Sequence, residues 1–269
     1  MKLKQLLVFT LLIFSFSKFT SAQNFKIDIF PNSKLYEKYF ADALSPQFSI
    51  SKHFESTQWF GNIGGELPIF NVGVSNLLLQ SSINATVFNT LIKTPGHIQV
   101  FTVDYRVDFT FDTEVSKNFF ARFIWGHVSA HFSDDGIIQL KHFPISYVRD
   151  YIGLHFERKL PILNGKFYIG SFYNFHNEPV LDKHTTFQLG GDAGVNIGNK
   201  VLFYAAIDIK IKSEVNNGTT QSYQLGLRFP YGEKVYFRLT YTHRRGFEER
   251  GQLYKLKDNK NLLGLFIDF

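Results

Sequence analysis

Apolar and polar residues alternate with period two along most of this chain, and this pattern limits the fold more than any other feature. In Gln99 to Phe111, apolar side chains take every second position, and Thr, Asp and Arg residues stand between them. Successive side chains of a β-strand point to opposite faces, so such a run forms a strand with one apolar and one polar face. Phe187 to Ile197, Val201 to Lys212 and Val235 to Arg244 repeat the pattern. We therefore expect an all-β protein.

Twelve segments carry this alternation, and the connections between them alternate in length. Connections after even-numbered segments are mostly short, such as Gly198-Asn199, whereas those after odd-numbered segments are mostly longer, notably Phe132 to Pro144 and Gly246 to Asn261. An even number of strands with short turns at one end and long loops at the other is typical of outer-membrane β-barrels. The sequence predicts an antiparallel transmembrane barrel of about 12 strands, at residues 45–54, 57–67, 76–88, 99–112, 117–131, 145–159, 166–176, 185–197, 200–212, 221–229, 234–244 and 261–269.

A soluble β-sandwich or lipocalin-like barrel would turn the apolar faces inward, and two features argue against it. Several polar faces are dense in charges of both signs, which fits the lumen of a small barrel. The last segment carries Leu263, Leu265, Ile267 and a final Phe269 on one face. This ending resembles the C-terminal signal by which bacterial outer-membrane barrels are recognised for assembly. The resemblance implies that the assembly machinery is a partner, through Phe269.

The first 22 residues have the features of a cleaved secretory signal: Lys2 and Lys4, an apolar core and a small-residue ending at Ala22. We expect residues 1–22 to be this signal, 23–44 a periplasmic lead-in and 45–269 the barrel, located in the bacterial outer membrane. Residues 34–44 are expected to form a short helix or to lie along the barrel mouth. Loss of the three signal lysines lowers the formal charge from +6 to +3, so charge does not indicate nucleic-acid binding.

The chemistry available to the chain is limited by its composition. The chain has no Cys, which excludes disulfides, thiolate metal sites and a cysteine nucleophile. Glycines are frequent from Gly61 to Gly65, but they lie inside a strand pattern and indicate a bend or bulge rather than a phosphate loop. We expect no cofactor, no metal and no nucleic-acid partner.

One predicted strand changes character along its lipid-facing side. Phe119, Ala121, Phe123 and Trp125 share one face, which continues as His127, Ser129 and His131. Polar groups on this face are tolerated best near the membrane interface, and Trp125 is expected to anchor the strand there. If the N-terminus is periplasmic, these polar residues lie at the outer leaflet. Asp150 lies on the same face of the returning strand, within a few residues of being opposite His127.

The segment His127-Val128-Ser129 resembles the catalytic segment of outer-membrane phospholipase A and of the outer-membrane lipid A deacylases. The resemblance implies that Ser129 is a nucleophile, His127 its base and Asp150 the group that orients the histidine. The partners would then be outer-membrane lipids, either phospholipid or lipopolysaccharide, and the reaction acyl-ester hydrolysis. Those families usually have Asn after the serine, whereas this chain has Ala130.

A longer stretch of the chain resembles an uncharacterised family of bacterial outer-membrane proteins that is known only as a domain of unknown function. Its pattern is close to H-x-S-S-H-L-G-D-E, and here Ala130 and Ser133 replace the second Ser and the Gly. The resemblance implies the barrel fold and gives no activity. It is carried by residues 104–107, 127–135 and 146–150.

Other interpretations of these residues stay open. The polar groups could be ordinary interfacial residues or contacts for lipopolysaccharide. His127, His131 and Asp134 could hold a metal, but His127 and His131 are about 13 Å apart in a straight strand, too far for one ion.

Arg149 and Glu157 are expected to pair inside the lumen. The lumen itself is expected to be crossed by ion pairs and largely filled, with a narrow pore as the alternative; its charges are Asp104, Arg106, Asp108, Arg122, Asp192, Asp208, Lys210, Arg228 and Arg238.

Overall fold

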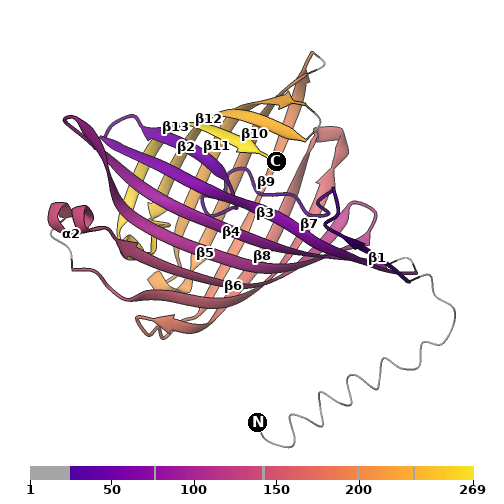
Figure 1. The fold of residues 1–269 in the computed structure, drawn as a ribbon, viewed down its shortest axis with the longest axis horizontal. Helices are drawn as coiled ribbons and strands as arrows, with labels where there is room; N and C mark the ends of the chain where they lie inside the picture. Colours follow the sequence, from indigo (N-terminus) through magenta and orange to yellow (C-terminus); the bar gives the residue numbers. More distant parts are fainter. Residues whose placement is uncertain (1–24, 76, 141–142, 199, 233) are drawn as a thin grey trace, which may run out of the picture.

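The computed structural model describes residues 25–75, 77–140, 143–198, 200–232 and 234–269. Twelve antiparallel strands, β2 to β13, form a closed barrel in which β13 pairs with β2 and β3 with β4 (Figure 1). One extra strand, β1, pairs with the end of β3 that β2 leaves free. The strands are β1 Phe25–Ile29, β2 Phe48–His53, β3 Gln58–Val74, β4 Leu77–Thr94, β5 His97–Ser116, β6 Phe119–Phe132, β7 Tyr147–Leu160, β8 Gly165–Glu178, β9 Thr185–Ile197, β10 Val201–Lys212, β11 Gly218–Tyr231, β12 Val235–Phe247 and β13 Lys257–Asp268.

The barrel confirms the predicted fold, and each of the twelve predicted segments overlaps one of the strands β2 to β13. The proposed signal at residues 1–22 lies outside the described residues. Short connections join the strands at the end where β2 begins, which we call the near end. The longest connections, 133–146 and 248–256, lie at the opposite end, which we call the far end. Strand β1 was not predicted, because five residues give too short an alternating run next to Pro31.

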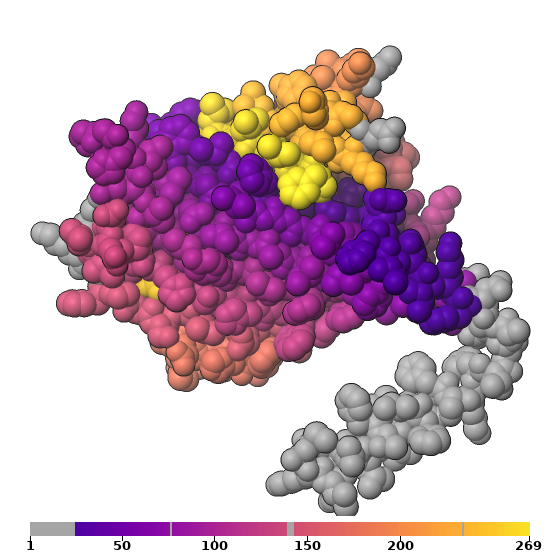
Figure 2. Space-filling model, in the orientation of Figure 1, coloured from indigo at the N-terminus to yellow at the C-terminus, as the bar shows by residue number. Residues whose placement is uncertain are grey.

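The two faces of the wall differ as a membrane barrel requires. Large apolar side chains are exposed on the outside, whereas the side chains that point inward are mostly polar or charged and buried. A soluble barrel or sandwich has the opposite arrangement, so the lipocalin-like alternative is excluded. Figure 2 shows the C-terminal strand in yellow lying against the N-terminal strands in indigo, where the barrel closes. The outward residues include Phe109, Phe123, Trp125, Ile152, Leu154, Phe167, Leu189, Phe203, Leu225, Leu239 and Leu265.

Residues 34–47, which we call the plug segment, lie inside the barrel. The segment contains no helix, so the short helix considered for residues 34–44 is not formed. Tyr39 is buried and stacks on Tyr168 of β8, with 3.5 Å between ring centroids. Asp42 accepts a hydrogen bond of 2.6 Å from Lys210 of β10. These contacts join the plug segment to the inner wall.

The connection between β12 and β13 also turns inward, from the far end. Gly251 N donates to Asp104 at 2.8 Å, and Glu249 pairs with Lys210 at 3.1 Å. Burial alone would raise the pKa of Glu249, but Lys210 and Lys212 outweigh it and lower that pKa to about 2. Lys210 therefore joins this connection to Asp42 of the plug segment.

Ion pairs lie on the inner wall of the barrel, as expected, but one expected pair does not form. Arg122 pairs with Glu66 and Asp112, at 2.7 Å and 2.6 Å. Arg149 and Glu157 are both buried in the lumen, as expected, but they do not pair with each other. Arg149 pairs with Glu214 at 3.1 Å, and Glu157 with Lys166 at 3.5 Å. Arg149 stands near the start of β7 and Glu157 near its end, so inward direction alone does not bring them together.

The bulge in β3 lies beyond the glycines that were expected to mark it. The β3–β4 register shifts between Pro68 and Phe70, whereas pairing is continuous from Gly61 to Gly65. A Cβ at Gly64 would meet Ala85 O at 2.3 Å, and one at Gly65 would meet the Phe269 ring at 2.9 Å. These two glycines therefore allow close approach of a neighbouring strand and of the last side chain.

The described residues include one short α-helix, α2, at Asp134–Leu140, which lies in the connection between β6 and β7. Ser133 N, just before it, donates to Phe101 O of β5 at 3.1 Å, so the helix starts from a fixed point on the wall. No helix among the described residues is long and apolar enough to cross a bilayer.

Candidate functional site

The polar residues on the outside of β6 face a carboxylate on β7. His127 and Asp150 are directly opposite in the β6–β7 register, and His127 Nδ1 lies 2.5 Å from Asp150 Oδ1. Both point outward, because the same parity places Phe123 and Trp125 of β6 on the outer surface. The pair lies where the apolar outer wall gives way to polar residues near the far end. The structure thus brings together two of the three residues singled out in the sequence.

A second histidine completes this cluster from β8. His176 is opposite Asp150 in the β7–β8 register, and His176 Nδ1 lies 2.8 Å from Asp150 Oδ2. The register shifts between Asp150 and Tyr151, so Phe175 is an extra residue on β8. The bulge turns His176 outward beside Phe175, and both are exposed. Strict alternation would point His176 inward, which is why sequence reasoning missed it.

The cluster is open to the outside of the barrel. The side chains of His127 and His176 are 49% and 54% exposed, and that of Asp150 is 28% exposed. Each oxygen of Asp150 accepts a hydrogen bond from one imidazole, which fixes both rings relative to the carboxylate. A molecule lying against the outer wall can therefore reach the histidines, while the carboxylate lies between them.

Ser129 is on the same outer face of β6, two residues beyond His127. Its register partners are Tyr105 of β5 and Val148 of β7, so apolar and aromatic side chains flank it. Its hydroxyl forms no hydrogen bond with any residue that the structure describes. The position is partly exposed. Ser129 therefore shares a face with His127, but the two side chains are not hydrogen-bonded to each other.

The bond to Asp150 decides which nitrogen of His127 is available. A carboxylate beside Nδ1 favours the tautomer that carries its proton there, which leaves Nε2 with a free lone pair. Nε2 is the atom through which a histidine held in this way accepts a proton from a serine. His127 and Asp150 are thus placed relative to each other as the histidine and the carboxylate of a catalytic triad would be.

The other polar residues of this region take different places. The ring of His131 lies 6.0 Å from that of Tyr105, between centroids, and Asp134 begins α2. No group of three His, Asp or Glu residues in the described ranges could hold a metal ion. Ala130, which follows Ser129, is buried, and its carbonyl accepts a hydrogen bond of 2.6 Å from Gln252 of the β12–β13 connection. Trp125 is exposed on the outer wall and tilted against Phe109, at 5.9 Å between centroids.

The fold is similar to that of solved outer-membrane phospholipases. Outer membrane phospholipase A from Escherichia coli, as an active-site mutant, superposes with a TM-score of 0.52 at 14% identity, over 88% of this chain and 93% of that one. Another structure of the Escherichia coli protein gives 0.51 at 15%, over 86% and 98%. The Salmonella typhi phospholipase dimer with bound calcium gives 0.52 at 13%, over 86% and 93%. Identities this low show a shared fold alone.

The sequence comparisons add no family. No family model matches the chain, and no curated protein matches it. The resemblance of residues 127–135 to the uncharacterised family therefore stays a prediction, as do the catalytic roles of His127, Ser129 and Asp150.

Proposed function

We propose that this chain is an outer-membrane barrel that hydrolyses an acyl ester of an outer-leaflet lipid. The observation that carries the proposal is the hydrogen bond between His127 and Asp150 on the outer wall, two residues from Ser129. A lipid ester lies at the boundary between hydrocarbon and headgroup. A residue that attacks it must face lipid near the end of a strand, and Ser129 meets both conditions. The barrel fold shared with outer membrane phospholipases supports the membrane location.

In the proposed reaction, Ser129 Oγ attacks the ester carbonyl carbon while its proton moves to His127 Nε2. The bond from the carbonyl carbon to the alcohol oxygen then breaks, and Nε2 returns the proton to that oxygen. Water repeats the sequence on the acyl-serine and releases the fatty acid. Asp150 does not change protonation; it holds the imidazole and stabilises the positive charge that forms on it.

The alternative is a barrel without catalysis, which serves as a structural protein, a lipid-binding protein or a narrow pore. A pore is disfavoured by the plug segment and the β12–β13 connection, which meet at Lys210 inside the lumen. A purely structural role does not account for a partly exposed carboxylate held by two imidazoles next to a serine. We therefore favour hydrolysis.

The test is fatty-acid release from phospholipid and lipopolysaccharide in mixed micelles by the purified, folded barrel. Ser129→Ala and His127→Ala should each lower the rate by about 10³-fold or more, because each removes one partner of the proton transfer. Two control variants should leave the rate unchanged. Ser171→Ala removes a partly exposed serine of β8, and His131→Ala removes the next outward histidine of β6. Hydrolysis that survives Ser129→Ala, or none by the native protein, would contradict the proposal.

A further inference from the structure

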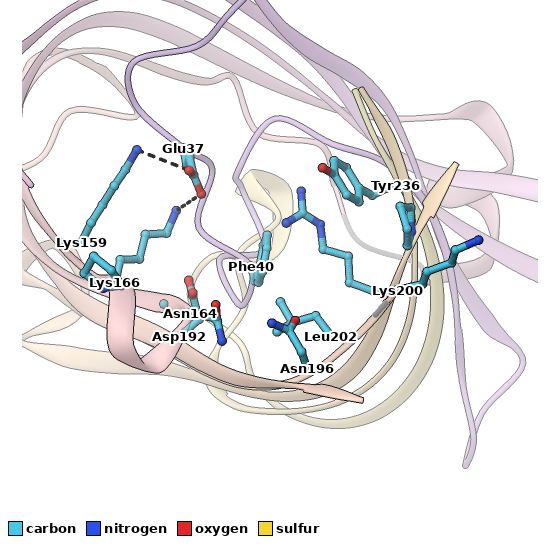
Figure 3. A pocket seen from close by; sticks show the side chains of 14 residues that line it. Glu37, Phe40, Lys159, Asn164, Lys166, Asp192, Asn196, Lys200, Leu202 and Tyr236 are labelled. Carbon is cyan, nitrogen blue, oxygen red and sulfur yellow. Dashed lines mark ion pairs between the residues drawn. The ribbon is translucent and has the colours of Figure 1, made fainter. Parts of the chain in front are cut away.

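A cavity of about 590 Å³ lies at the near end of the barrel, between the plug segment and the inner wall (Figure 3). Its wall residues come from the ends of β7 to β12, whereas Asp150 lies near the other end of β7. The cavity is therefore separate from the histidine cluster, and what it binds goes beyond the proposed hydrolysis. Its volume is within the range of about 300–1,000 Å³ that small-molecule sites occupy.

Positive charge is in excess around this cavity. Glu37 of the plug segment pairs with Lys159 at 3.4 Å and with Lys166 at 3.8 Å, as the dashed lines in Figure 3 mark. These pairs compensate the lysines on one side. Lys200 and Arg228 also line the cavity and form no ion pair within the described residues, where Asp192 is the other acidic lining residue.

Arg228 is held in a position that suits a ligand. Its guanidinium lies 3.7 Å from the centre of the Tyr236 ring and 5.7 Å from that of Phe40. Its Nε is buried and has no hydrogen-bond partner in the described structure. Its register neighbour Arg238 is paired with Asp268, at 2.6 Å, and gives it no counter-charge. A guanidinium that lines a cavity with no ion-pair or hydrogen-bond partner among the described residues is a strong site for an anionic group, because charge-assisted hydrogen bonds are about twice as strong as neutral ones.

The rest of the lining suits the body of the ligand and the group at its other side. Phe40, Leu202 and Tyr236 present apolar and aromatic surface to the cavity. Asp192 Oδ2 is buried and, like Arg228 Nε, has no hydrogen-bond partner in the described structure. Buried polar atoms are normally satisfied, whereas Arg228 and Asp192 line the cavity with no hydrogen-bond partner among the described residues, and each can bind a polar group of a ligand.

We propose that this cavity binds a small organic anion with an aromatic or apolar body. The anionic group lies on the guanidinium of Arg228, the body packs on Phe40 and Tyr236, and a hydroxyl or ammonium group at the other end donates to Asp192. In the orientation proposed for the barrel, the site faces the periplasm.

The experiment is calorimetric titration of the full-length folded barrel in detergent with tyramine phosphate, which carries a phosphate, an aromatic ring and an ammonium group. We expect saturable binding, weakened about tenfold or more by Arg228→Gln. Arg245→Gln removes an exposed arginine near the far end, which donates to Gln221, and should bind like the native protein. Phenyl phosphate lacks the ammonium group and should bind the native barrel more weakly than tyramine phosphate does. In Asp192→Asn the two ligands should bind with equal affinity.

Heat-modifiable migration on gels verifies that each variant is folded before it is titrated. The site would be refuted if the native barrel does not bind tyramine phosphate saturably, or if Arg228→Gln and Arg245→Gln weaken binding equally. Tyr236→Leu, which removes the stacking surface and keeps the charge, gives a second reading if Arg228→Gln does not fold. It should also weaken binding, and unchanged affinity in that variant would overturn the proposal.

Discussion

The carboxylate of Asp150 lies between two imidazoles, and each of its oxygens serves one ring. Parity along two strands was sufficient to predict that His127, Ser129 and Asp150 share the outer face. It could not predict His176, because the extra residue Phe175 reverses the parity of β8 at that point.

At the residue scale, Asp150 and its second partner His176 should affect hydrolysis to different extents. Asp150→Asn should lower the hydrolysis rate by on the order of 10²-fold, because an amide cannot stabilise the imidazolium that forms during proton transfer. His176→Gln should lower it less, since His176 contacts the carboxylate and not the serine. Initial rates measured as a function of pH check this, with His131→Gln as the matched control.

If Asp150→Asn hydrolyses lipid as fast as the native protein at every pH, Asp150 does not position the base. A larger loss in His176→Gln than in Asp150→Asn would instead make His176 the base, and the assignment of His127 would be wrong.

At the scale of elements, the strands were predictable and the segments between them were not. Alternation marks a strand whose two faces meet lipid and lumen, so β2 to β13 appear in the sequence even where their ends differ from the prediction. The plug segment has no such period, because Tyr39 and Asp42 each fit one particular part of the wall. The inward turn of residues 248–252 is set in the same way by contacts such as that of Gly251 with Asp104.

The C-terminal strand β13 closes the barrel against β2, and the ring of Phe269 contacts Gly65. Deletion of Phe269 should reduce the amount of heat-modifiable barrel in outer membranes to a small fraction of the native amount. The expected reason is loss of the aromatic end by which the assembly machinery recognises the strand. Phe269→Tyr keeps an aromatic ring and should assemble normally. Unchanged insertion after the deletion would remove Phe269 from any role in assembly.

At the scale of the whole molecule, the barrel is closed by hydrogen bonds and occupied by its own chain. The plug segment contacts the wall at the near end, where Lys166 donates to Lys38 O. The β12–β13 connection enters from the far end, where Gly251 N donates to Asp104. Lys210 contacts both, through Asp42 at 2.6 Å and Glu249 at 3.1 Å. The sequence predicted the charges of the lumen and their inward direction, but not these partners, since pairing depends on how far each strand is staggered in the barrel.

Reconstituted native protein should therefore give no steady ion current in planar bilayers. Deletion of residues 34–44 should open a conducting path, because it removes Tyr39, Asp42 and their contacts from the lumen. Deletion of residues 25–29 removes β1, leaves the plug segment in place and should stay closed. Conductance of the native barrel equal to that of the 34–44 deletion would show that the plug segment does not seal it.

The central claim, that Ser129 is a nucleophile activated by His127, is tested most directly by covalent labelling. Outer membranes that contain the native protein are treated with a fluorophosphonate, and the modified peptide is identified by mass spectrometry. The account predicts one adduct, on Ser129, which is lost in His127→Ala and retained in His131→Ala. No adduct on Ser129 in the folded native barrel, or equal labelling of Ser129 after His127→Ala, would contradict it.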